Sequence, residues 1–266
     1  MKRLFTYTPN FWPSWGLLGL LLVCQLVATV PSNLLTLIFG TNIQSWQHLF
    51  LYVFSFVLMG LIVIQLGKSQ SPTATPVTER SKTTFPLYIL LLFLIHLLSI
   101  AIEPLYMWIP MPQWIEELFA SMFTAEFATF VMAVIAAPFA EEWLCRGVIL
   151  KGLLANRMPP YKAIAWSALI FAVMHLNPWQ AVPAFCLGFA IGWVYWRTKS
   201  LWPCIFMHAV NNGLAFILLL LFPDIPTNAS LYDLIPTYYP LIYAGAVMLS
   251  IVIGYILWRM IGERRG

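Results

Sequence analysis

The sequence predicts an all-α integral membrane protein, a polytopic bundle of about eight transmembrane helices forming a single domain over residues 1–266. Three observations carry this prediction. Hydrophobic residues make up 61% of the chain and charged residues only 9%, whereas a soluble domain carries roughly 25% charged residues. The apolar residues fall into long runs, and about 20 such residues span the hydrocarbon core of a bilayer. The charges between the runs are segregated in the way that alternating membrane sides require.

Eight apolar segments are predicted to be membrane helices. They lie at 15–39, 49–66, 85–102, 127–154, 163–176, 181–196, 201–222 and 241–261. Pro31 interrupts the first segment, and the fifth is short for a span. The motifs described below concentrate in a core of about 127–222.

Three connecting stretches have a readable composition. Residues 67–84 are rich in Ser, Thr and Pro, which predicts a flexible cytoplasmic loop. Residues 114–119 mix aromatic and acidic side chains, which predicts a short helix in the outer membrane interface. Residues 223–240 hold four prolines and several tyrosines, which suits a cap over the outer ends of the helices.

The charges predict the topology. With the N-terminus in the cytoplasm and eight alternating helices, every Lys and Arg except Arg146 falls on the cytoplasmic side. This excess of Lys and Arg inside is what the positive-inside rule asks for. The acidic residues that fall on the other side are Glu103, Glu116, Glu117, Glu126, Asp224 and Asp233. Both termini are therefore predicted to be cytoplasmic. The N-terminus does not resemble a transit peptide, which favours a prokaryotic cytoplasmic membrane, and the absence of a basic run interleaved with aromatics gives no support to a nucleic-acid partner.

The most informative stretch is 137–147, because it places Glu141, Glu142 and Arg146 inside an apolar run. A charge at membrane depth costs about 2.5–3.5 kcal/mol on insertion scales, so such residues are usually functional. Glu142 and Arg146 are four residues apart and share a helix face, which predicts a structural ion pair. Glu141 is rotated by about 100° from Glu142 and can face other helices.

Two further segments bring polar groups to membrane depth. His175 ends one of them, and His208 and Asn212 lie four residues apart on the other, where Asn211 is a substitute for Asn212. A carboxylate can take a proton from water with help from an imidazole. An imidazole and an amide can donate hydrogen bonds to the developing oxyanion. A glutamate and two histidines could equally hold zinc, which would activate the water instead.

Each residue taken alone also has a structural interpretation. A single membrane histidine often only forms a hydrogen bond between helices, and we interpret His48 and His96 in that way. The cysteines form no CxxC pair and are predicted to be buried free thiols. They are Cys24, Cys145, Cys186 and Cys204.

Taken together, the motifs resemble those of a known family. They read Glu141-Glu142-x-x-x-Arg146, Phe171-x-x-x-His175 and His208-x-x-x-Asn212, with Ala137-Pro138 before the glutamates and Gly147 after the arginine. This set resembles the CPBP (Abi) family, which contains the type II CAAX prenyl endopeptidases and bacterial relatives linked to bacteriocin processing and self-immunity. Each motif is short, but three in this order on separate apolar segments are specific together.

The resemblance implies an intramembrane endopeptidase that acts on a membrane-associated peptide or protein. It implies that Glu141 activates water with the help of His175, that His208 and Asn212 stabilise the oxyanion, and that Glu142 and Arg146 support the site. The metal-free mechanism is favoured because no HExxH pair is present. The alternative is a zinc site at Glu141, His175 and His208. His175 lies near the outer end of its segment, so segment 163–176 must be tilted, or Ala163 must lie well below the membrane surface, for His175 to reach Glu141.

Two other function classes remain open on the sequence. A proton-coupled transporter also places carboxylates and histidines at membrane depth, but it would favour inverted repeats, and we find no internal repeat. A non-catalytic membrane scaffold would keep the same fold and use the bundle to hold a partner protein.

Overall fold

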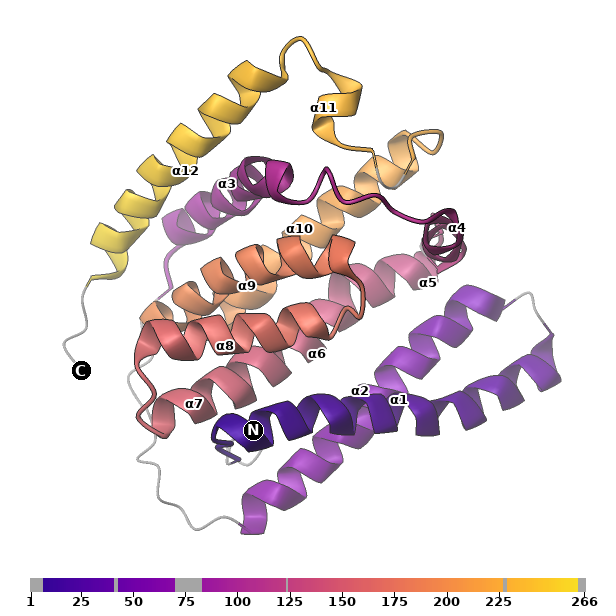
Figure 1. Ribbon diagram of the computed structural model, residues 1–266. Coiled ribbons are helices and arrows are strands. Elements are labelled where there is room, and N and C mark those ends of the chain that lie inside the picture. The colour runs from indigo at the N-terminus through magenta and orange to yellow at the C-terminus, as the bar shows by residue number, and fades with distance from the viewer. Residues whose placement is uncertain (1–6, 41–42, 70–82, 123, 227–228, 263–266) are drawn as a thin grey trace.

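The computed structural model describes residues 7–40, 43–69, 83–122, 124–226 and 229–262, which form helices and loops without any strand (Figure 1). Six helical stretches among them are long and apolar enough to cross a membrane. These are α1 (Phe11–Phe39), α2 (Gln44–Ser69), α3 with the 3₁₀ turn η3 (Phe85–Leu105), the continuous stretch α5–α7 (Phe127–Ala155), α10 (Leu201–Leu221) and α12 (Tyr239–Ile261). The all-helical membrane fold predicted from the sequence is confirmed.

Two more helices complete the bundle. Helix α8 (Pro160–Val173) is apolar but has only 14 residues, and α9 (Pro178–Thr198) has 21. All eight predicted segments are therefore helical. Most of the predicted loop 67–84 and several charges of the predicted topology lie outside the described residues.

The end of α8 differs from the prediction for 163–176, because the helix stops at Val173. Asn177 is the N-cap of α9 and its side chain accepts a hydrogen bond from the Gln180 N–H. Pro178 follows at the first helical position, where its ring disfavours helical backbone in the residue before it. The chain therefore turns between 174 and 177, and His175 lies in that turn rather than in a helix.

Helices α8 and α9 pack closely as an antiparallel pair in the centre of Figure 1. Two glycines of α9 make this contact close. A Cβ atom at Gly192 would lie 3.0 Å from Ile164 Cγ2, and one at Gly188 would lie 3.0 Å from Phe171 Cδ1. Small residues let membrane helices approach in this way. Elsewhere α1 packs on α2, α12 packs on α3, and α10 contacts α3, α9 and the α5–α7 stretch.

The α5–α7 stretch is a continuous helix with two π-helical segments. Its parts are α5 (Phe127–Phe130), η4 (Val131–Ala136), α6 (Ala137–Glu142), η5 (Trp143–Leu150) and α7 (Lys151–Ala155). A π-helix bonds each N–H to the carbonyl five residues earlier and often marks a functional site. The glutamate-bearing helix α6 lies between the two π segments.

The outer surface of the bundle is strongly apolar. Large apolar side chains point away from the core on several helices, among them Leu26 at 70%, Leu37 at 81% and Leu241 at 76% exposed. Exposure on this scale is unusual for a soluble monomer and fits contact with lipid tails. Helix α1 begins left of the centre of Figure 1, and α12 ends at its left side.

Two short helices lie in the connections. The predicted helix at 114–119 is present as α4 (Gln113–Met122). Helix α11 (Leu231–Leu234) begins with a capping box between Ser230 and Asp233. The buried carboxylate of Glu103, in η3 (Glu103–Leu105), accepts a hydrogen bond from the Leu231 N–H and so joins α11 to the end of α3.

Candidate active site

Glu142 and Arg146 form the buried ion pair that their spacing predicts. Arg146 Nη1 lies 2.8 Å from Glu142 Oε1, and both side chains are fully buried. Arg146 Nη2 also donates a 2.8 Å hydrogen bond to the Gly188 carbonyl, and the guanidinium lies over the Phe171 ring at 4.7 Å from its centroid. The pair therefore connects the α5–α7 stretch to both α8 and α9.

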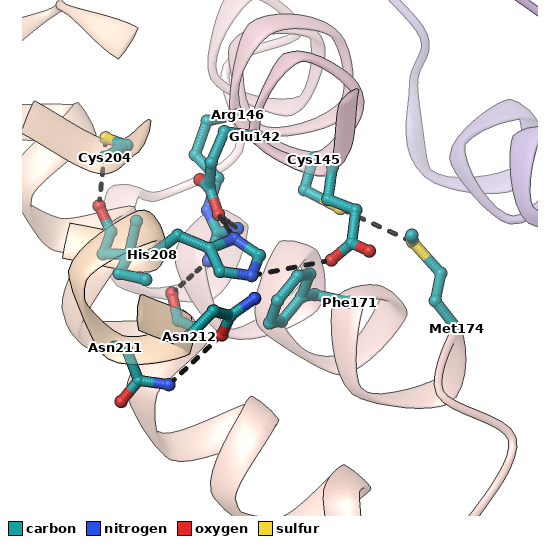
Figure 2. Close-up of polar contacts among 12 residues, drawn as sticks. Glu142, Cys145, Arg146, Phe171, Met174, Cys204, His208, Asn211 and Asn212 are labelled. Carbon is teal, nitrogen blue, oxygen red and sulfur yellow. Dashed lines mark hydrogen bonds and ion pairs between the residues drawn. The ribbon is translucent and has the colours of Figure 1, made fainter. Parts of the chain in front are cut away.

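His208 of α10 lies between the two glutamates. Its Nδ1 is 2.9 Å from Glu142 Oε1, the same oxygen that Arg146 contacts, and Figure 2 shows the three side chains together. Its Nε2 is 3.9 Å from Glu141 Oε2. The sequence predicted Glu142 as the partner of Arg146 only. In the structure it also fixes the imidazole, since an Nδ1–H that donates to a carboxylate sets the orientation of the ring.

The two carboxylate oxygens of Glu141 have different surroundings. Oε1 accepts a 2.8 Å hydrogen bond from the Tyr52 hydroxyl of α2. Oε2 is buried and accepts no hydrogen bond within the described residues, although His208 Nε2 is nearby. Sequence reasoning missed Tyr52, because a tyrosine in an apolar segment has no feature that separates it from a lipid-facing or interfacial aromatic residue.

His175 lies in the turn after α8 and reaches the site from there. Its Nδ1 is 2.9 Å from the Phe171 carbonyl oxygen, which fixes the ring against the end of α8. His175, Glu141 and Tyr52 border one cavity of about 80 Å³. The early end of α8 at Val173 is thus what carries His175 to the side of Glu141, where the sequence had required a tilted helix.

Asn212 has a structural contact that follows from the π segment η4. The Ala137 N–H bonds to the Met132 carbonyl in π register, so the next bond would run from residue 138 to Ala133. Pro138 has no N–H and cannot make it. Asn212 Nδ2 donates to the Ala133 carbonyl at 2.9 Å instead. One of the two amide hydrogens of Asn212 remains available to another acceptor.

Asn211 contacts Asn212 and, like it, borders the larger of two cavities at the site. Its Nδ2 lies 3.4 Å from Asn212 Oδ1, and its Oδ1 accepts a 3.1 Å hydrogen bond from the Ser99 hydroxyl of α3 (Figure 2 shows the two asparagines). These contacts set the orientation of the Asn212 amide.

A second cavity, of about 170 Å³, adjoins the first, and His175 borders both. It is lined by His175, His208, Asn211 and Asn212 with Gln180 and by the apolar residues Ile95, Phe171, Pro183, Ala184, Leu187 and Ile191. The four residues predicted to be catalytic are therefore arranged around two neighbouring cavities between α2, α3, α6, α8, α9 and α10.

The three residues of the alternative zinc set, Glu141, His175 and His208, are not gathered around one point. Within the described part of the chain, no three His, Cys, Asp or Glu side chains lie closely enough together to hold a metal ion. Of this set, His208 Nε2 and Glu141 Oε2 lie 3.9 Å apart, and His208 Nδ1 is bonded to Glu142.

The cysteines are free thiols, as predicted. Cys24, Cys145 and Cys204 are buried, and Cys186 is half-buried. Cys145 contacts the Met174 sulfur at 3.7 Å, and the Ser167 hydroxyl donates to its carbonyl at 2.8 Å. These contacts fit the interpretation of Cys145 as a packing residue.

The fold and the site together define a polytopic membrane protein with a buried carboxylate–imidazole centre suited to hydrolysis. In comparison with known proteins, the model of the type II CAAX prenyl endopeptidase Rce1-like family matches residues 84–214. This match confirms the resemblance seen in the motifs. The matched segment contains all of the predicted site residues and excludes Tyr52.

One similar protein also has a name that describes a membrane peptidase. The "Putative membrane peptidase YdiL" of Bacillus subtilis (strain 168) is 28% identical over 88 residues, which cover 33% of this chain and 36% of the relative. The chain therefore spans about a third of the length of that relative. No solved structure matches the chain significantly. The family and the relative are thus both named as peptidases.

Proposed function

We propose that the protein is an intramembrane endopeptidase that hydrolyses a peptide bond in a membrane-associated substrate, for which a prenylated CAAX-type segment is one candidate class. The observation that carries the proposal is the position of His208, with Nδ1 on Glu142 and Nε2 facing the free Oε2 of Glu141. A carboxylate with one unpartnered oxygen beside a fixed imidazole is a suitable general base.

In the proposed reaction Glu141 takes a proton from a water molecule, and the oxygen of that water attacks the substrate carbonyl carbon. His175 borders the same cavity as Glu141 and assists by holding the water. The carbonyl oxygen becomes an oxyanion as the tetrahedral intermediate forms. Glu141 then transfers its proton to the leaving amine as the peptide bond breaks, so that proton and charge balance.

The oxyanion needs hydrogen-bond donors that are already in place. His208 and the free amide hydrogen of Asn212 border the larger cavity and are the proposed donors. His208 can donate from Nε2 when that nitrogen carries a proton.

The larger cavity suits the proposed substrate. Apolar residues, among them Ile95, Leu187 and Ile191, line it together with the polar groups. A CAAX sequence places two aliphatic residues after the prenylated cysteine, and such residues gain free energy on entering an apolar cavity. We place both termini on the cytoplasmic side of the membrane, on the strength of the charge pattern.

The test is cleavage of a farnesylated CAAX peptide by the purified protein in liposomes, followed by mass spectrometry of the products. We expect wild type to release a C-terminal fragment and Glu141→Gln to release none. Glu117→Gln is the matched control, because this substitution makes the same chemical change at an exposed residue of α4, away from the site. Cleavage by Glu141→Gln at the wild-type rate would refute the assignment of Glu141 as the base.

A further inference from the structure

The carboxylate of Glu141 is held from a helix that lies outside the family-matched segment. Tyr52 of α2 donates its hydroxyl hydrogen to Glu141 Oε1 at 2.8 Å, across 89 residues of sequence. The match to the family covers residues 84–214 and therefore does not include Tyr52. The contact is the only hydrogen bond that the Glu141 side chain makes within the described residues.

The surroundings of Tyr52 fix its position. The ring packs against Phe56 one helical turn away, with centroids 4.9 Å apart, and it is part of the layer that covers the hydrophobic core. Its hydroxyl reaches the smaller cavity, which Gln25, Glu141 and His175 also line. The tyrosine is thus anchored by its ring and presents its hydroxyl to the carboxylate.

This contact has a consequence for the orientation of Glu141. The last torsion of a glutamate side chain is broad and nearly two-fold, so nothing intrinsic decides which oxygen faces which way. A hydrogen bond from a neutral donor to a carboxylate is charge-assisted and stronger than a neutral one. By holding Oε1, Tyr52 leaves Oε2 directed at His208 Nε2, which is the arrangement that the proposed reaction uses.

We propose that Tyr52 is a positioning residue that orients the general base Glu141 for proton transfer. This inference rests on the proposed function. Tyr52 does not exchange a proton with the substrate; it keeps the carboxylate in the orientation from which the proton is taken. A tyrosine that only filled space would be replaceable by phenylalanine, which keeps the ring and its contact with Phe56.

The first experiment compares Tyr52→Phe with wild type on the farnesylated CAAX peptide in liposomes. Correct orientation of a reacting group contributes to kcat, whereas substrate binding is unaffected by a group that does not touch the substrate. We expect kcat to fall about 10-fold to 100-fold, because a hydrogen bond to a charged group is worth that factor. We expect KM to change by less than about twofold.

Tyr88→Phe is the matched control. Tyr88 lies on α3 and its ring packs edge-on against Phe206, with centroids 5.1 Å apart, away from Glu141. The Tyr88→Phe variant should have the wild-type kcat and KM. If Tyr52→Phe keeps the wild-type kcat while Glu141→Gln is inactive, the positioning role is wrong and the proposed function stands. If Glu141→Gln is active, the proposed function itself fails.

A second measurement tests the contact without any turnover. Thermal unfolding midpoints in detergent are compared for Tyr52→Phe, Glu141→Leu and the double variant. Because the two side chains are hydrogen-bonded, the shifts should be non-additive, with the double variant less destabilised than the sum of the single variants. Additive shifts would show that the two groups do not interact and would overturn the inference.

Discussion

Replacement of Arg146 by methionine should destabilise the bundle strongly. The change keeps an unbranched apolar stem but removes the cation beside Glu142. The side chains of Glu142 and Arg146 are both fully buried. Removal of one partner of a buried ion pair costs roughly 3–5 kcal/mol, because the other charge is left uncompensated. The variant also loses the hydrogen bond to Gly188 and the contact with the Phe171 ring.

Two details set the magnitude near the lower end of that range. Glu142 Oε2 and Arg146 Nε make no hydrogen bond, so the native pair is not fully satisfied. His208 Nδ1 remains as a partner for Glu142 after the arginine is removed. We therefore expect a loss of about 3 kcal/mol for Arg146→Met. This is a large fraction of the roughly 5–15 kcal/mol that stabilises a typical protein.

The assay is unfolding by sodium dodecyl sulfate in mixed micelles, followed by circular dichroism. Arg146→Lys should be intermediate, because lysine supplies a charge to Glu142 but lacks the planar fork that also reaches the Gly188 carbonyl. The double variant Glu142→Met/Arg146→Met should be less destabilised than the sum of the single variants, because it leaves no unpaired charge. A loss of less than about 1 kcal/mol in Arg146→Met, or additive effects in the double variant, would refute the reasoning.

Two other predictions follow from the site. Asn212→Leu should lower kcat by about 100-fold or more, since removal of one oxyanion donor has that effect. The same variant should be destabilised by about 1–3 kcal/mol, because the Ala133 carbonyl loses its donor. Asn211→Leu, measured in the same assay, should lower kcat less, and a larger loss than in Asn212→Leu would contradict the assignment of Asn212. Peptide cleavage should persist after dialysis against 1,10-phenanthroline, because no zinc ligand set is assembled in the described residues; loss of activity that zinc restores would show that a metal takes part.

The positions of the helices could be predicted because hydropathy dominates their formation. Every apolar segment proposed from the sequence is helical, and the short fifth segment corresponds to the 14-residue helix α8. Its end was predicted three residues too late, since apolar composition continues through Leu176 while Asn177 and Pro178 already begin the next helix.

The residues of the candidate site and the Glu142–Arg146 pair could be proposed from the sequence, but the contacts between helices could not. Glu141, His208 and Asn212 became candidates because ionisable and amide groups at membrane depth are rare and usually functional. The two π segments were not predicted from the sequence. Without knowledge of the π segments, the hydrogen bond from Asn212 to the Ala133 carbonyl could not be predicted. The hydrogen bond between Tyr52 and Glu141 could not be predicted either, because the two residues are 89 positions apart in the sequence.

The central claim is that Glu141 makes this protein a protease. The most direct test compares, by mass spectrometry, the termini of membrane proteins in cells that express wild type or Glu141→Gln at matched levels, with Glu117→Gln as the control. We predict new termini in cells with wild type and Glu117→Gln that are absent with Glu141→Gln. Identical termini in all three would contradict the claim and favour a membrane scaffold or a transporter.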